Sequence, residues 1–511
     1  MENNQRSHGY FCQFPVCNRI LSTEVSSDFS LPDYKSEMRK LLSTKVKLMP
    51  PKKYVGNGAA TVEGELIYKI LYVGADGSPY CATLSDKYRF DADLDFNEHS
   101  LNSDEVFFDC FCECESVSTH VLGPRKINLK SKLSCKVLAL SPAIYSPELV
   151  GEHDGATVEN RVLECSSILL KSCESEPISL SDLISIDPQI DNIRIIETST
   201  RVMVSECAPS TNALHVRGEV YAKILYCNDA QSDEALCFFR KLPFSTSIPC
   251  EGVGNSFECC AYGTVTDESF RIEENGISIE LLLTLCAELY KNVPTPYVYD
   301  AFSTERVCEN ESAEVEYLSF VKALCGNLTQ SESFSLSELK IDPDAKIIDA
   351  DAKAHVDSMS IEKGKALLLG ECHYHLLLCN DGEYWSCDVS APLRYEMDMR
   401  AISSEISPEL LCAKPEVLSV RSRCDGERIF LDCELNFCIS ILAKSKIKAL
   451  KKVTFGEKLQ KAKGKMTLCY PHTNASLWDI AKQYGEPLEK LRMQNSIGED
   501  HDISKKKFLV I

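Results

Sequence analysis

Residues Val62–Tyr72 read VEGELIYKILY, residues Val216–Tyr226 read VRGEVYAKILY, and residues Leu368–Leu378 read LLGECHYHLLL. In each copy a Gly-Glu pair opens an apolar run, and the glycines stand at positions 64, 218 and 370. This period is too long for a solenoid, whose repeats span roughly 20–50 residues. A copy of this length can bury a core of its own, so the pattern predicts three related domains.

Other positions repeat in the same order on both sides of the Gly-Glu pair. The copies share a short motif near their start, an apolar pair, and a closing run that alternates with a period of two. The short motif begins at Phe29, Ile178 and Phe334, and the apolar pair begins at Leu41, Ile195 and Ile347. The closing run begins at Ile127, Ile277 and Ile429. Alternation is typical of half-buried strands. The turn sequences GADG, CND and NDG follow the three apolar runs, where Gly, Asn and Asp suit tight hairpins.

These patterns predict a mainly β fold with three repeated antiparallel, sandwich-like β domains. We also expect a few helical turns around Asp33–Leu42, where an N-terminal proline precedes charged pairs. Composition shifts set the expected boundaries. We predict a tail at 1–9 and three β domains at 10–150, 160–295 and 313–445. Linkers are expected at Pro142–Asn160 and Asn292–Ala313. A lysine-rich basic linker at 446–465 then leads to a small module at 466–511.

Charge and hydropathy limit the partners of the chain. The formal net charge is −21, with acidic residues spread along the sequence, and such a surface repels phosphate backbones. No stretch approaches the about 18–20 apolar residues of a membrane span. The N-terminus lacks the basic and apolar segments of a secretory signal. We therefore expect a cytoplasmic protein with no nucleic-acid partner and no membrane span.

The 26 cysteines allow two interpretations, a disulfide-rich exported protein or a cytosolic protein with reduced thiols in its cores. The absent signal favours the second. Several cysteines stand at corresponding positions of the three copies, which we call repeat columns. One column contains Cys110, Cys260 and Cys412, and the other contains Cys81, Cys237 and Cys387. The run Cys110-x-Cys112-x-Cys114 has no second pair at zinc-finger spacing. We predict cysteines that pack in the cores, with no metal site and no cofactor.

The C-terminal module has a helical pattern. Its apolar residues at positions 477, 480, 481 and 484 follow the spacing of an amphipathic helix. Ser476 suits the N-cap of that helix and Gly485 its C-terminal turn, while Pro487 opens a second helix. The strand-like pieces MTLCY and KFLVI bracket the pair. The expected order is therefore strand, helix, helix, strand.

The stretch SLWDIAKQYGEPLEKLRMQN, which ends at Asn495, resembles the LysM family. The resemblance implies binding of N-acetylglucosamine polymers through loops before the first helix and after the second. Asn474-Ala475 replaces the usual Gly-Asp, and Ser504-Lys505 stands where Pro-Gly is usual. These replacements favour a protein contact over a glycan contact. The candidate binding residues are Leu477, Trp478, Lys482, Leu491 and Met493.

The repeats together with this module resemble the SPOCS-domain, SipL-like family of spore coat morphogenetic proteins. The resemblance rests on FSLPDYKSEMRKLLS, the V-x-G-E strands and the closing alternating strands, and it covers Tyr10–Ile511. It implies assembly of the spore envelope in the mother-cell cytoplasm, at the forespore surface. It also implies binding to coat morphogenetic proteins, including the ATPase of the coat basement.

An enzymatic function finds no support in the sequence. The chain has no phosphate-binding G-x-x-x-x-G-K-[ST] loop, no H-E-x-x-H and no G-x-S-x-G. The repeated glutamates Glu65, Glu219 and Glu371 suit a structural role, such as a β-bulge, better than a catalytic role in triplicate. We predict a non-catalytic scaffold. The alternative is an exported cell-wall protein that binds peptidoglycan through the LysM-like module.

Overall fold

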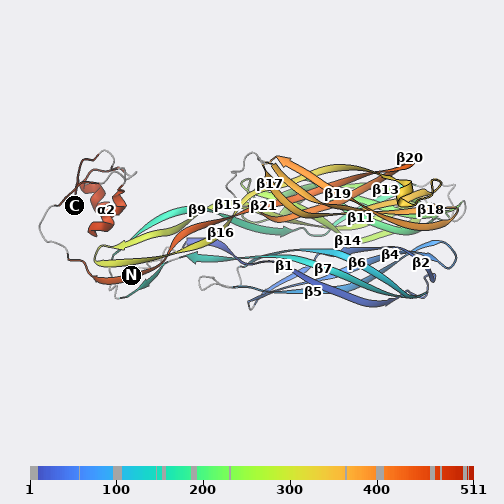
Figure 1. Ribbon diagram of the computed structural model, residues 1–511, viewed down its shortest axis with the longest axis horizontal. Helices are drawn as coiled ribbons and strands as arrows, with labels where there is room; N and C mark the ends of the chain where they lie inside the picture. Colours follow the sequence, from blue (N-terminus) through green and yellow to red (C-terminus); the bar gives the residue numbers. More distant parts are fainter. Residues whose placement is uncertain are drawn as a thin grey trace.

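The computed structural model consists almost entirely of strands, with a small helical module at one end (Figure 1). It describes residues 10–56, 58–95, 106–145, 147–151, 157–185, 193–228, 232–274, 276–362, 365–398, 408–460, 467–471, 475–498, 503 and 506–511. The predicted tail at 1–9 and the end of the basic linker, 461–465, lie outside these ranges. The described strands up to Lys458 form three units of two sheets each, and a further two-stranded sheet lies in the C-terminal module.

Unit one is a sandwich of two antiparallel sheets. The first sheet has the order β1-β7-β6, and in the second the central strand β4 pairs with β2 and β3 on one side and β5 on the other. The strands are β1 (Tyr10–Ser30), β2 (Met38–Leu48), β3 (Lys52–Gly56), β4 (Ala59–Gly74), β5 (Pro79–Asp93), β6 (Phe107–Gly123) and β7 (Lys126–Tyr145).

Unit two repeats this arrangement. Its sheets have the orders β10-β15-β14, with β9 also on β15, and β11-β12-β13. The strands are β9 (Val158–Glu174), β10 (Ile178–Ser185), β11 (Ile193–Ser210), β12 (Ala213–Asn228), β13 (Ser232–Pro249), β14 (Glu258–Glu273) and β15 (Gly276–Ser303).

Unit three has the sheets β16-β21-β20 and β17-β18-β19. The short strand β8 pairs in parallel with β21, although it precedes unit two in the chain. The elements are β8 (Glu148–Val150), β16 (Arg306–Ser335), α1 (Leu336–Leu339), β17 (Lys346–Glu362), β18 (Lys365–Asn380), β19 (Glu383–Asp398), β20 (Pro408–Asp425) and β21 (Arg428–Lys458). The prediction of a mainly β fold built from antiparallel sheets is confirmed.

The apolar runs that follow the repeated Gly-Glu pairs form β4, β12 and β18. Each is the central strand of the second sheet of its unit. In β4, Leu66, Tyr68 and Ile70 face the core of unit one. Leu71 and Val73 point the other way, into a cluster shared by all three units. A strand buried on both faces needs apolar residues at consecutive positions, which explains why these runs do not alternate strictly.

The shared cluster lies where the second sheets of the three units meet. It contains equivalent residues from every unit. The cluster has three sets of equivalents, each with one residue from units one, two and three in that order. The first set is Leu42, Ile196 and Ile348, the second is Leu71, Leu225 and Leu377, and the third is Val73, Cys227 and Cys379. A register shift after Leu41, Ile195 and Ile347 marks a bulge at the same place in β2, β11 and β17. The next residue of each strand therefore turns away from its own core and toward the other units.

Polar contacts between the units run in a cycle. A basic residue at one repeat position of β2, β11 or β17 reaches the penultimate strand of the next unit. These contacts are Lys47 to the Val265 carbonyl at 2.9 Å, Arg201 to Glu416 at 3.5 Å, and Lys353 to the Cys114 carbonyl. The cycle runs from one to two, two to three and three to one, so the units pack with pseudo-three-fold symmetry.

The repeated glycines are required by close backbone approach. A Cβ at Gly64 would overlap the Tyr88 ring, and one at Gly370 would overlap the His355 carbonyl. Gly218 and Gly370 also pair with the first residue of a bulge, Val204 and Val356 respectively. The expectation that the Gly-Glu pair marks a bulge is confirmed in units two and three. In unit one the pair faces the break between β2 and β3.

Two predictions near the start of the repeats are wrong. The stretch Asp33–Leu42 forms a turn followed by β2, because the Arg125 guanidinium donates hydrogen bonds to the carbonyls of Pro32, Asp33 and Lys35. The motif at Ile178 is also out of register. Phe29 and Phe334 pair with the repeated Ile127 and Ile429, whereas the residue opposite Ile277 is Ile184.

The expected boundaries at 160, 295, 313 and 445 fall inside long strands rather than in linkers. Asn292–Ala313 belongs to β15 and β16, and β21 continues through the basic segment to Lys458. Opposite charges stabilise this pairing, as Lys444 and Lys446 both contact Glu316.

We call the strand segments 158–174, 289–303, 306–320 and 442–458 the arm. The arm extends from the body toward the helical module (Figure 1).

Candidate functional site

The C-terminal module consists of two short helices and two short antiparallel strands. They are β22 (Leu468–Cys469), α2 (Leu477–Tyr484), α3 (Leu488–Gln494) and β23 (Leu509–Val510). Ser476 caps α2 in a reciprocal capping box with Asp479, and Gly485 ends the helix with a φ of 62°. The Asn495 side chain accepts from the Val510 N–H at 2.6 Å and donates to its carbonyl at 2.8 Å. This residue therefore ties the end of α3 to β23.

The structure divides the five candidate binding residues into three groups. Leu477 and Leu491 are fully buried in the core of the module, so neither side chain is available to a partner. Trp478 and Lys482 contact the arm. Met493 is 73% exposed. Asn474, Ser504 and Lys505, on which the argument against glycan binding rests, lie outside the described residues.

Asp300 on β15 holds the module against the arm. Its carboxylate accepts hydrogen bonds from Trp478 Nε1 at 2.8 Å and from Lys482 Nζ at 2.6 Å. The Trp478 ring packs edge-on against Phe302 with the ring centroids 5.0 Å apart. Burial opposes ionisation of Asp300, but the hydrogen bonds from Lys482 and Trp478 lower the pKa of its carboxyl on balance. The carboxylate therefore stays charged in the docked module.

An exposed aromatic pair was missed by the sequence reasoning. Tyr470, next to β22, is 63% exposed, and Phe508, next to β23, is 45% exposed. Their ring centroids lie 6.3 Å apart. The two residues are 38 positions apart in the chain, so only the pairing of β22 with β23 brings them together. The signal available in the sequence was that each strand-like piece, MTLCY and KFLVI, carries one aromatic residue.

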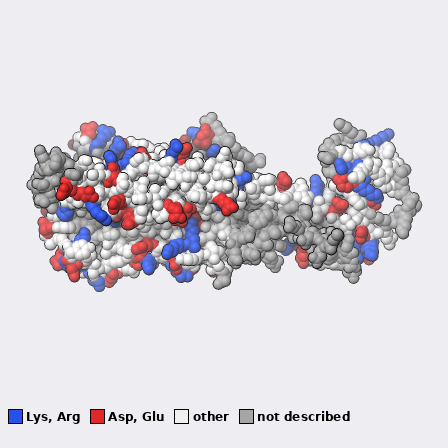
Figure 2. Space-filling model, turned by 180° about the vertical axis from the view of Figure 1, so that it is seen from behind, with Lys and Arg blue, Asp and Glu red and all other residues white. Residues whose placement is uncertain are grey.

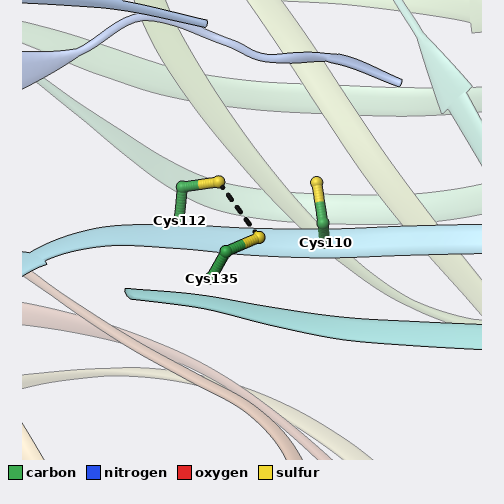
Figure 3. Close-up of side chains that lie close together, drawn as sticks. All are labelled: Cys110, Cys112 and Cys135. Carbon is green, nitrogen blue, oxygen red and sulfur yellow. Dashed lines mark hydrogen bonds between the residues drawn. The ribbon is translucent and has the colours of Figure 1, made fainter. Parts of the chain in front are cut away.

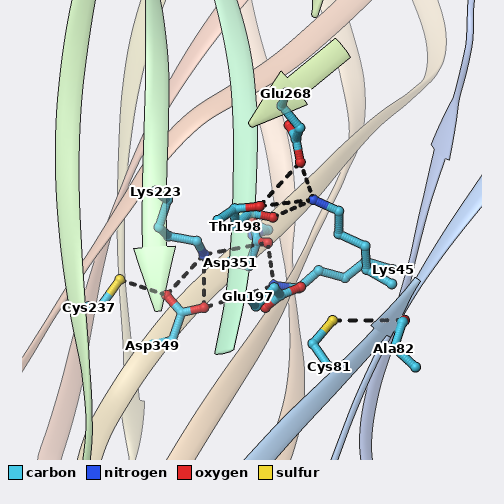
Figure 4. A network of polar contacts seen from close by, with 12 residues as sticks. Lys45, Cys81, Ala82, Glu197, Thr198, Lys223, Cys237, Glu268, Asp349 and Asp351 are labelled. Atoms are coloured by element: carbon cyan, nitrogen blue, oxygen red, sulfur yellow. Dashed lines mark hydrogen bonds and ion pairs between the residues drawn. The ribbon is translucent and has the colours of Figure 1, made fainter. Parts of the chain in front are cut away.

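A second group of functional side chains lies at the centre of the three units (Figure 4). Lys45 from unit one contacts Glu197 of unit two at 2.9 Å and Asp351 of unit three at 3.2 Å. Lys223 from unit two binds both oxygens of Asp349 at 2.8 and 2.9 Å. All five side chains are buried or largely buried. We call them the central ion network.

Within the central ion network, neighbouring opposite charges favour the charged state of Lys45, Lys223 and Asp351. Burial opposes the charge on Lys45, but its neighbours Glu197, Asp351 and Asp349 raise its pKa well above the ordinary value. Burial likewise opposes ionisation of Asp351, yet Lys223 and Lys45 lower its pKa. Breaking one pair in such a network leaves a buried charge without compensation. The arrangement therefore fixes how the units sit against one another.

The cysteine columns are only partly kept in the structure. Cys81 and Cys237 lie opposite equivalent leucines of the shared cluster, but Ser386 occupies the corresponding place and Cys387 faces the core of unit three. Cys260 and Cys412 are equivalent by their strand partners. Cys110 is one position out of this column, because it pairs with Val137 rather than Leu138. Bulges shift the alignment of the Cys110 column, and a hairpin loop that is one residue shorter in unit three than in unit one shifts that of Cys387.

Two groups of three thiols are brought together among the described residues. In unit one, Cys110 and Cys112 of β6 lie near Cys135 of β7, with 3.3 Å between the sulfurs of Cys112 and Cys135 (Figure 3). The second group combines Cys260 of unit two with Cys325 and Cys438 of unit three. In each group all ligand atoms lie within 4.8 Å of one another. Spacing in the sequence gave no hint of the second group.

The surface carries both charges. Figure 2 shows acidic and basic side chains interspersed over the face in view, without one dominant patch. Among the residues that the structure describes, none of the helices combines the length and apolar character needed to cross a membrane.

Comparison with known families gives a match within unit two. Residues 190–273 match the family described as SipL, SPOCS domain. The matched segment covers β11, β12, β13 and β14, which are one whole sheet of unit two and one strand of the other. This similarity supports a SipL-like family and a function related to sporulation. No curated protein and no solved structure matches the chain.

Proposed function

We propose that the chain is a non-catalytic scaffold in assembly of the spore envelope. In this proposal it acts at the forespore surface in the mother-cell cytoplasm and binds coat morphogenetic proteins, among them the ATPase of the coat basement. The observation that carries the proposal is the match of residues 190–273 to the SipL SPOCS domain. The strands in that segment have counterparts in units one and three, so the same kind of surface is presented three times.

The contacts that join the three units of the body support a scaffold function. Its three units are held by the shared apolar cluster and by the central ion network. The arm carries the C-terminal module away from this body (Figure 1). A rigid body with a displaced small module suits a protein that joins two partners, because the separation between their binding sites is then fixed.

We assign the protein contact of the module to its exposed side. Trp478 and Lys482 already bind Asp300, so they serve docking in the first place. Tyr470, Phe508 and Met493 remain exposed. Exposed aromatic residues and methionine are enriched in protein interfaces. A coat morphogenetic protein with a complementary apolar surface would bury them.

A pull-down from sporulating cells tests this assignment. The full chain with Tyr470→Ser and Phe508→Ser is compared with a chain that carries Tyr54→Ser and Phe239→Ser. The control pair is similarly exposed, at 51% and 44%, but lies on the body. We expect the module variant to lose a coat morphogenetic protein that the wild type and the control retain. Equal recovery by both variants would move the contact away from the module.

Peptidoglycan binding through the module is the second candidate. The Tyr470 and Phe508 pair supports it as well, since exposed aromatic rings can pack on the faces of sugars. Sedimentation of the purified chain with peptidoglycan separates the two functions. Retention in the pellet that the Tyr470→Ser and Phe508→Ser variant loses would favour the glycan. Trp478→Ala is a poor probe, because it also removes the contact with the arm.

A further inference from the structure

Three thiols converge at the junction of units two and three. Cys260 comes from β14 of unit two, Cys325 from β16 and Cys438 from β21 of unit three. Cys325 and Cys438 are direct cross-strand partners, and their sulfurs lie 3.1 Å apart. The third sulfur comes from another unit, so the group exists only when the two units are assembled.

The surroundings of the group are those of a built site. Cys260 and Cys438 are 3% and 6% exposed, whereas Cys325 is exposed. Two thiols are therefore shielded from solvent and one leaves a path of entry. The buried Ser440 hydroxyl lies 3.4 Å from the Cys260 sulfur and 2.7 Å from the Tyr290 hydroxyl, and either of the two can accept its one proton. Such a second-layer hydrogen bond orients a thiolate ligand.

Packing alone does not account for this arrangement. A cysteine that serves as a small core residue lies among apolar side chains, but Cys325 is exposed and contacts two other thiols. The position equivalent to Cys438 is Cys286 in unit two and Lys136 in unit one, but their strand partners are Glu174 and Ile20 rather than a cysteine, so the repeat alone does not produce the group. The Cys110 group differs, because its thiols come from one sheet and face the core of unit one.

We propose that Cys260, Cys325 and Cys438 bind a zinc ion that joins unit two to unit three. Zinc takes thiolate ligands at about 2.3 Å, which spaces sulfurs around a tetrahedral ion by about 3.8 Å. The three sulfurs here already lie within 4.8 Å of one another. The exposed Cys325 has the freedom to open its 3.1 Å contact. A water molecule at the solvent side completes the four ligands.

Charge favours zinc over a monovalent thiophilic ion. Three thiolates with a divalent ion leave one net negative charge, whereas copper(I) would leave two, and burial of charge is costly. The exposed Cys325 is the ligand that a metal ion from solution meets first.

Metal content of the full chain tests the site. The purified chain is loaded with zinc under a reductant that does not bind metal, dialysed and measured by elemental analysis. We expect Cys325→Ser to hold less zinc than the wild type by about one equivalent per chain. Cys424→Ser is the matched control, because Cys424 is the other cysteine of unit three found exposed among the described residues. It should keep the wild-type content.

Two further readouts tie the metal to the junction. Cobalt should give a thiolate charge-transfer band in the wild type and in Cys424→Ser, and a weaker band in Cys325→Ser. A chelator should lower the melting temperature of the wild type more than that of Cys325→Ser, because binding to the folded state stabilises it. Equal zinc content in Cys325→Ser and Cys424→Ser would overturn the proposal, even if zinc were bound elsewhere in the chain.

Discussion

Replacement of Asp300 by alanine should release the C-terminal module from the arm. The substitution removes the carboxylate that accepts the Trp478 N–H, and it removes the ion pair with Lys482. Trp478 is only 7% exposed, so its N–H would be left buried without an acceptor. A buried donor left without a partner costs about 1–3 kcal/mol. The partly exposed ion pair adds no more than about 1 kcal/mol. We therefore expect docking to weaken by about 2–3 kcal/mol, or about 30–150-fold.

Tryptophan fluorescence can measure this release directly. The chain has two tryptophans, Trp385 and Trp478, so a Trp385→Phe background reports on Trp478 alone. Acrylamide should quench Trp478 more strongly after Asp300→Ala. Asp300→Asn should have a smaller effect, because the amide keeps one acceptor oxygen but loses the charge.

The matched control for this prediction is Glu280→Gln. Glu280 is an exposed acidic residue of the same strand, β15, far along the strand from the docking contact. Its neutralisation should leave Trp478 quenching unchanged. If Asp300→Ala gave the same quenching as Glu280→Gln, the contact with Asp300 would not hold the module against the arm.

Three more outcomes are expected. The docked Asp300 has a lowered pKa, so docking is at full strength above the pKa of about 4 of the undocked residue and is lost as the pH falls through the lower docked value. Quenching of Trp478 should therefore rise in this pH range. Asp300→Asn should abolish this pH-dependent rise. Gly370→Ala should lower the free energy of unfolding by about 1–3 kcal/mol in denaturant titrations, since its Cβ would overlap the His355 carbonyl. Lys223→Met should cost about 3 kcal/mol in the same assay, because Asp349 loses its bidentate partner.

Each of these outcomes has its own control. Gly56→Ala places a Cβ in open space, so a loss as large as that of Gly370→Ala would argue against the overlap. Lys87 is an exposed lysine of β5, and Lys87→Met should change stability by less than about 0.5 kcal/mol. In a double-mutant cycle, Lys223→Met combined with Asp349→Asn should cost less than the sum of the two. Strict additivity would contradict a direct buried pair.

The fold could be predicted from the sequence because equal patterns recur at equal spacing. The pairs at Leu41, Ile195 and Ile347 proved to occupy the same place in three sheets. Spacing failed where a bulge inserts a residue, as for Cys110, and where a hairpin loop is one residue shorter, as for Cys387, since counting along the chain cannot detect a local shift of register. It failed again at Asn292–Ala313, where proline and charge suggested a linker but pairing with β9 and β21 forms the arm.

The candidate site was less predictable, since its contacts join distant segments. The helix pattern around Trp478 identified the module but could not show that Asp300, nearly two hundred positions earlier, accepts from its indole. The two buried leucines, Leu477 and Leu491, have the same apolar spacing as residues of a binding face would have. Helical periodicity identifies an apolar face but does not tell a core from an interface.

The central ion network has a consequence for how such a protein can evolve. In a trimer of identical chains, every position near the axis carries the same side chain three times, so charged residues there would face their own copies. Here the three copies lie in one chain and have diverged: Glu197 and Asp349 correspond to Ser43 of unit one, and Lys45 corresponds to Asp351 of unit three. Opposite charges can therefore meet at the centre. The units are no longer interchangeable, and a chain with one unit duplicated in place of another would bring like charges together and fail to assemble.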